Sequence, residues 1–136
     1  MSAPLRYDGA MNELTMTLLS GPGRPLGDAT RRIRVQLALD QQGMPDPQAW
    51  HTDPEPWRAW LEAPDAPDRT GDIQYEEDFG WYFRMPEGDN DLSDATTWVI
   101  HFPQAPVRPG ETVITRGPEG EDWAWRIVAV EATQSG

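Results

Sequence analysis

Residues 79–85 read Phe79-Gly80-Trp81-Tyr82-Phe83-Arg84-Met85 and form the densest aromatic run in the chain. Large apolar side chains stand at every second position of this run, so a β-strand would carry on one face Phe79, Trp81, Phe83 and Met85. Tyr82 and Arg84 would then point to the opposite face. This spacing predicts the central strand of a β-rich domain, with the apolar face turned toward the core.

Two earlier segments, 12–19 and 32–39, show the same alternation of apolar and polar side chains, which is typical of half-buried strands. For the second segment a helix is an alternative prediction, because Asp28 could cap it and Ile33 and Leu37 form an i,i+4 pair. The strict alternation and the β-branched side chains favour a strand.

One short helix is expected over residues 54–62. Asp53 suits the N-cap position and Pro54 suits the first turn. One face of this helix would carry the apolar side chains at i, i+3 and i+4, namely Trp57, Trp60 and Leu61. Such a face would plug an open end of the sheet structure.

The remaining sequence predicts consecutive strands over 72–76, 79–85, 96–102, 111–116 and 123–131. The first two are also compatible with one long strand interrupted by a bulge. The predicted fold class is mainly β (α+β), a small antiparallel barrel or sandwich of about seven strands with one short helix. We expect a single domain over residues 1–136, with loose ends at about 1–4 and 133–136.

The composition indicates a chain that folds without disulfide bonds. Its 136 residues include seven tryptophans and no cysteine, so disulfides and thiolate metal sites are excluded and aromatic side chains are expected to fill the core. All eleven basic residues are arginine, as is typical of a GC-rich genome, and we expect a bacterial source. The start lacks the apolar run of a signal peptide, and no stretch is long and apolar enough to span a membrane, so a cytoplasmic protein is expected.

The negative charge is concentrated in residues 62–94. The formal net charge is −12, and this segment alone carries eleven acidic residues against Arg69 and Arg84, a net charge of −9. A surface of this sign disfavours direct binding to nucleic acid phosphates, which requires cationic side chains. It favours a basic protein partner, although acidic loops also serve solubility alone.

The sequence offers no complete catalytic or metal-binding motif. His51, Asp53 and Glu55 could donate metal ligands from one loop, but the neighbouring prolines and the predicted capping role of Asp53 compete with this use. Residues 89–94 begin like a calcium-binding loop, yet the sixth position lacks glycine and the twelfth, Ile100, lacks the glutamate. No catalytic residue, metal or cofactor is therefore predicted.

We interpret the chain as a binding protein and not an enzyme. The leading hypothesis is an acidic module of the inhibitor or immunity type that covers a basic site on a partner protein, without direct contact with nucleic acid or membrane. Its acidic rim would consist of Asp78, Glu87, Asp89, Asp91 and Asp94. Its anchors would be side chains of the kinds that are enriched at interfaces, namely Tyr82, Arg84 and Trp50.

Two other function classes are compatible with the sequence. A structural subunit of an assembly, such as a phage particle or a secretion apparatus, would form homo-oligomers or pair strand edges. A carboxylate-dependent hydrolase would need a deep pocket in which two carboxylates face each other, at least one of them with a raised pKa.

Overall fold

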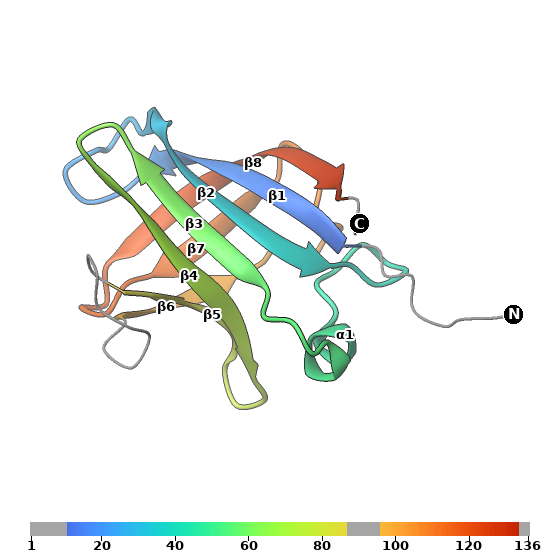
Figure 1. Ribbon diagram of the computed structural model, residues 1–136. Helices are drawn as coiled ribbons and strands as arrows, with labels where there is room; N and C mark the ends of the chain where they lie inside the picture. The colour runs from blue at the N-terminus through green and yellow to red at the C-terminus, as the bar shows by residue number, and fades with distance from the viewer. Residues whose placement is uncertain (1–10, 87–95, 134–136) are drawn as a thin grey trace, which may run out of the picture.

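A closed barrel of eight antiparallel strands dominates the computed structural model, which describes residues 11–86 and 96–133. The strands are β1 (Met11–Ser20), β2 (Asp28–Ala38), β3 (Arg58–Ala63), β4 (Ala66–Glu76), β5 (Gly80–Met85), β6 (Thr96–His101), β7 (Thr112–Arg116) and β8 (Asp122–Ala132), and the helix α1 (Pro47–Thr52) lies between β2 and β3. Each strand pairs with the next one along the chain, and β8 closes the barrel on β1 (Figure 1). The predicted antiparallel barrel is confirmed, with eight strands instead of about seven.

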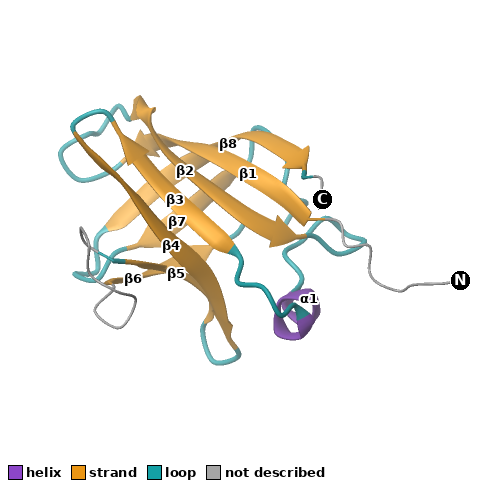
Figure 2. Cartoon of the chain, viewed as in Figure 1, coloured by secondary structure: helices purple, strands orange, loops and turns teal. Residues whose placement is uncertain are grey.

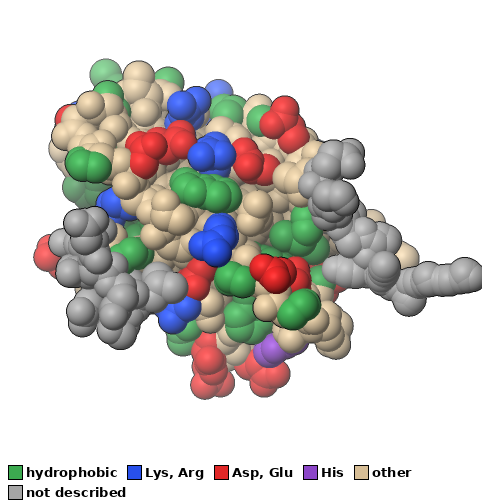
Figure 3. Space-filling view, in the orientation of Figure 1, with side chains coloured by type: hydrophobic (Ala, Val, Ile, Leu, Met, Phe, Trp, Pro, Cys, Tyr) green, Lys and Arg blue, Asp and Glu red, His purple; other side chains and the backbone are tan. Residues whose placement is uncertain are grey.

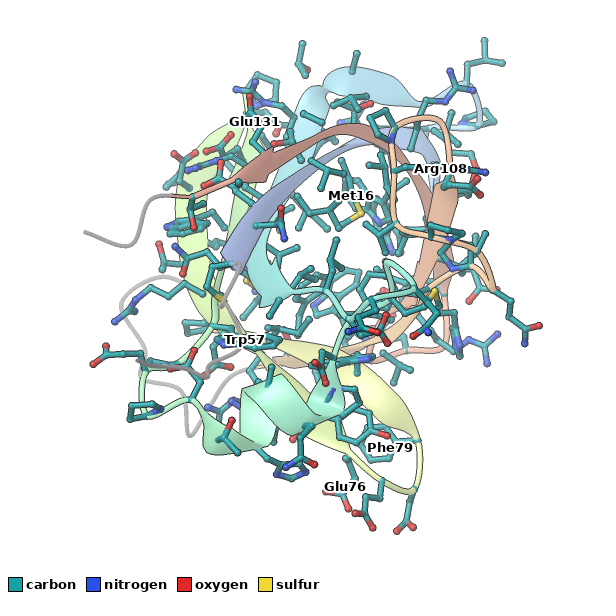
Figure 4. All side chains as sticks on the ribbon, turned by 90° about the vertical axis from the view of Figure 1, so that its right-hand side faces the viewer. Met16, Trp57, Glu76, Phe79, Arg108 and Glu131 are labelled. Atoms are coloured by element: carbon teal, nitrogen blue, oxygen red, sulfur yellow. The ribbon has the colours of Figure 1, made fainter. Side chains whose placement is uncertain are left out.

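The first two strands show how alternation builds the interior. Their inward-facing, buried side chains are Leu14, Met16, Leu18, Ile33, Val35 and Leu37. Met16 lies inside the ring of strands in the view along the barrel (Figure 4). The strand prediction for 32–39 is therefore confirmed over most of its length, and the helix alternative is wrong.

The aromatic run quoted above forms β5 together with the turn before it. Trp81, Phe83 and Met85 are buried, whereas Tyr82 and Arg84 lie on the outer face, as the alternation predicts. Phe79 departs from this pattern, because it belongs to the turn between β4 and β5 and is 51% exposed. Gly80, the first residue of β5, adopts a positive φ of 93°, so the strand alternation does not continue back to Phe79.

The position of the predicted helix is wrong. Residues 58–63 form β3, in which Ala59 is buried while Trp60 lies on the outer face beneath the Arg34 guanidinium, 4.7 Å from the ring centroid. The observed helix is α1, which Asp46 caps by accepting hydrogen bonds from the amides of Gln48 and Ala49. One short helix is thus present, and it begins seven residues earlier in the chain than expected, at Pro47 instead of Pro54.

The segment 72–85 is a hairpin and not one long bulged strand. β4 and β5 pair in register from Asp72 opposite Arg84 to Glu76 opposite Gly80, and the chain reverses over residues 77–79. The predicted loose ends lie outside the described residues except for Thr133, whose amide donates to the Met11 carbonyl oxygen over 2.9 Å.

The two ends of the barrel carry different structures (Figure 2). At one end, which we call the α1 end, lie α1 and the β4–β5 turn, and the ring of Trp57 stacks on that of Trp81 at 5.8 Å. At the other end, which we call the tryptophan end, lie the β1–β2, β3–β4 and β7–β8 connections and the rings of Trp98, Trp123 and Trp125. The predicted plug of Trp57, Trp60 and Leu61 on one helix face is wrong, because Trp60 and Leu61 belong to β3; Trp57 lies before β3 and is buried.

In the described part of the chain, no helix is long and apolar enough to cross a membrane.

Candidate functional site

The predicted site residues lie in different parts of the fold. Tyr82 and Arg84 lie on the outer face of β5, Trp50 lies in α1, and Asp78 lies in the β4–β5 turn. The other four predicted rim residues lie outside the described residues: Glu87, Asp89, Asp91 and Asp94. The residues that flank them, Pro86 and Thr96, stand at the tryptophan end, opposite to Asp78. The single acidic rim stays a prediction, and Asp78 is the member that the structure describes.

Arg84 is held by a carboxylate of its own chain. Its Nε donates to Asp72 Oδ1 over 2.9 Å and its Nη2 donates to Asp72 Oδ2 over 2.5 Å. This forked hydrogen bond raises the pKa of the Arg84 guanidinium. Because Asp72 is only 4% exposed, the pair fixes β4 to β5, and Arg84 is less free to anchor a partner than the sequence suggested.

Trp50 also has a structural role. Its Nε1 donates to the Ile73 carbonyl oxygen in β4 over 3.2 Å, and its half-buried ring packs against the core. The neighbouring His51 is exposed, and its ring meets the edge of Tyr75 at 6.2 Å. These two contacts attach α1 to the end of β4, and so bring the loop after α1 close to the β4–β5 hairpin.

Five acidic side chains therefore gather at the α1 end, and we call them the acidic cluster: Asp53, Glu55, Glu76, Glu77 and Asp78. All except the half-buried Asp53 are exposed. In Figure 3, acidic side chains project at the lower tip of the molecule, whereas acidic and basic side chains alternate over the upper part of that face. Figure 4 shows two labelled residues of this end, Glu76 and Phe79, at the tip of the β4–β5 hairpin.

No member of the acidic cluster takes part in an ion pair within the described residues, and this is also true of six other described acids, namely Asp40, Asp46, Asp68, Glu119, Glu121 and Glu131. Among the described residues, ion pairs engage acids on the barrel wall and at the tryptophan end: Glu13, Asp28, Glu62, Asp65, Asp72, Glu111 and Asp122. None of these ion pairs includes a member of the cluster, and Arg58, which lies at the same end, is not joined to it. Within the described residues, no ion pair therefore compensates the negative charge of the cluster.

Phe79 is the functional candidate that sequence reasoning missed. It stands beside Asp78 in the turn, 51% exposed, with its ring 5.2 Å from that of Tyr82. The alternation assigned Phe79 to the core, whereas the turn presents it to solvent. An exposed aromatic ring braced by a second ring is typical of an interface anchor. The acidic sequence Glu76-Glu77-Asp78 directly before it was the available signal for a turn.

A polar groove of about 360 Å³ continues the acidic cluster along α1. Asp53 and Glu55 line it together with Trp50, His51 and Gln74. Asp53 is fixed in place, because its Oδ2 accepts a hydrogen bond from Trp57 Nε1 over 2.8 Å and its Oδ1 accepts one from the Glu55 amide over 2.9 Å. The described residues contain no group of three histidine, aspartate or glutamate side chains placed to hold a metal ion.

Comparisons with protein-family models, with curated proteins and with solved structures found no match for this chain.

Proposed function

We propose that the protein is an acidic protein-binding module of the inhibitor or immunity type, and that its α1 end covers a basic surface of a partner protein. The observation that carries this proposal is the exposed ring of Phe79 at the end of the barrel that holds the acidic cluster, whose members make no ion pair with another described residue. Of the predicted rim, this surface includes Asp78.

The physical argument has two parts. Uncompensated carboxylates at one end of a molecule attract a basic partner over several ångströms and raise the rate of association, most strongly at low ionic strength. The exposed ring of Phe79 then supplies apolar area that contact removes from water, which slows dissociation. In this proposal the acidic cluster speeds association with the partner, and the rings of Phe79 and Tyr82 form the apolar contact that slows dissociation.

The closed barrel bears on the assembly alternative. Because β8 pairs with β1, the sheet formed by the described strands has no free edge along which copies could add strands. An assembly role would therefore have to use side-chain surfaces. Of the function classes compatible with the sequence, the protein-binding module has the most support from exposed groups.

Reversing two charges of the acidic cluster tests the proposal. In the double variant Glu77→Lys and Asp78→Lys, we expect the rate of association with the basic partner at low salt to fall about tenfold or more, and its salt dependence to weaken. The partner would first be isolated by a tagged pull-down from the source cells in low salt, and association would then be followed by surface plasmon resonance.

The matched control is the double variant Asp68→Lys and Glu119→Lys, which makes the same change in net charge at exposed positions of the tryptophan end. We expect it to slow association much less than the first variant does. Equal effects of the two variants would mean that only net charge matters, and an unchanged rate in the first variant would refute the acidic cluster as the binding surface.

A further inference from the structure

A small apolar pocket lies inside the tryptophan end, away from the acidic cluster, and we call it the tryptophan pocket. Most of its wall comes from three cross-strand pairs: Ile33 with Leu61, Phe83 with Trp98, and Thr115 with Trp123. Met85 and Trp125 complete the apolar part of the wall. Because the lining side chains come from strands on several sides of the barrel, the pocket is a space within the barrel and not a crease on its outer face.

The wall of the pocket extends from the core to the rim of the barrel. Its inner members are almost fully buried, with exposed fractions of 1% for Phe83 and 3% for Trp125. Leu61, Trp98 and Trp123, in contrast, are half-buried. The pocket therefore reaches from the interior toward the surface of the tryptophan end, and the mouth of a barrel is a common place for a small-molecule site.

Water is a poor occupant of this pocket. A buried water molecule needs two to four polar partners. Thr115, which lines the pocket, already accepts a hydrogen bond from Trp125 Nε1 over 3.0 Å. Arg31, the charged residue of the wall, is held in ion pairs with Asp28 and Asp65. These polar groups are already paired within the protein, so an apolar guest takes no polar partner away from them.

The wall offers a guest strong dispersion contacts. Three indoles, a phenyl ring and the thioether of Met85 are large, polarisable groups. Atoms that face an empty space lose contacts on that side, and a guest that fills the space restores them. The indoles also support one another, because ring centroids lie 5.8 Å apart for Trp98 and Trp123 and 6.4 Å apart for Trp123 and Trp125. This packing keeps the wall from closing over the space.

The volume of the pocket sets the size of the guest. The pocket holds about 70 Å³, roughly half of the 150 Å³ engineered apolar cavity that stays dry and binds benzene or xenon. By the same comparison, the tryptophan pocket accepts a hydrocarbon of about three carbon atoms, or one xenon atom, and excludes a six-carbon ring.

We propose that the tryptophan pocket is a binding site for small, uncharged, apolar molecules of up to about three carbon atoms. Such a guest is held by dispersion and by the loss of its contact with water, with no hydrogen bond to the protein. The site is separate from the proposed protein-binding surface, because it lies at the opposite end of the barrel.

Cyclopropane and xenon are the probes for this site, and the readout is the ¹H–¹³C methyl resonances of the intact protein. We expect both gases to shift the methyl resonances of Ile33 and Met85, which line the pocket, more than that of Met16, which lies elsewhere in the core. The dissociation constant is expected to be on the order of 1 mM or weaker, because a ligand with so few atoms makes few contacts. Benzene at the same concentration is expected to leave these resonances in place.

The variant Leu61→Phe tests the location of the site, since it adds about three carbon atoms at the wall and so fills the space. We expect it to weaken the binding of both gases at least about tenfold. The matched control is Leu39→Phe, the same change at a half-buried leucine of the α1 end that does not line the pocket, and it is expected to keep the binding.

The proposal is overturned if neither gas shifts the Ile33 and Met85 resonances of the unaltered protein, a result that requires no variant to fold. It is equally overturned if Leu61→Phe binds the gases as well as Leu39→Phe does. Binding of benzene as tight as that of cyclopropane would contradict the size limit.

Discussion

The variant Gly71→Ala is expected to lose at least about 3 kcal/mol of unfolding free energy, or to fail to fold, because β4 has no room for a methyl group there. An added Cβ would lie 1.8 Å from the carbonyl oxygen of Arg84 in β5. That carbonyl cannot turn aside without disturbing the pairing of Asp72 with Arg84. Urea unfolding followed by tryptophan fluorescence measures the loss.

Gly120→Ala is the control for this variant. Gly120 has open space around its Cβ position but a positive φ of 84°, so alanine there is strained without a clash and is expected to cost about 1–2 kcal/mol. The difference between the two variants measures the close approach of β4 and β5. If the Gly71→Ala variant were at least as stable as the Gly120→Ala variant, the close approach of β4 and β5 at Gly71 would be contradicted.

The variant Arg84→Met is expected to lose about 2–4 kcal/mol, because it leaves the carboxylate of Asp72 buried without its cation. The expected loss is below that for a fully buried pair, since the Arg84 side chain is itself 34% exposed. The Asp72 side chain is only 6% exposed, so water can replace the guanidinium poorly. The same unfolding experiment measures this loss.

Two further variants distinguish an unpaired buried carboxylate from lost side-chain packing as the cause of the lower stability. Arg116→Met removes a guanidinium that also makes a forked contact, with Asp122, but both side chains are more than half exposed, and the stability is expected to change little. Adding Asp72→Leu to Arg84→Met removes the unpaired carboxylate and is expected to recover most of the loss. A double variant as unstable as Arg84→Met alone would show that packing, and not the buried charge, is responsible.

Alternation of side chains predicted most of the barrel. Strands are amphipathic with a period of two wherever one face is buried, and the buried residues of β1, β2 and β5 follow that period in the sequence. Closure of the sheet, in contrast, depends on β1 pairing with β8, residues more than a hundred positions apart. A barrel and a sandwich share the same local pattern, which is why the sequence left both open.

The helix was misplaced because the same dipeptide occurs twice. Asp46-Pro47 begins α1, whereas Asp53-Pro54 follows its end, and both fit the local pattern of an N-cap followed by proline. The spacing of Trp57, Trp60 and Leu61 also fits a helix. The alternative period of two was present in Trp57, Ala59 and Leu61, and pairing of β3 with both β2 and β4 decides in its favour. Tertiary pairing thus overrides a local signal.

The candidate surfaces were predictable only in part. The excess of acidic residues was evident in the sequence, but the position of Glu76, Glu77 and Asp78 at the α1 end depends on the β4–β5 hairpin. The pairing of Asp72 with Arg84 and the exposure of Phe79 arise from the hairpin register. The tryptophan pocket brings together side chains from six strands, so no single segment carries its signature.

The most direct test of the acidic cluster as a protein-binding surface is carboxylate footprinting. The free protein and its complex with the basic partner would be labelled with a carbodiimide and glycine ethyl ester, and each site would be quantified by mass spectrometry. We expect the labelling of Glu55, Glu76, Glu77 and Asp78 to fall in the complex, while that of Asp68 and Glu119 stays unchanged. Protection of Asp68 and Glu119, with the acidic cluster still labelled, would contradict the proposed function.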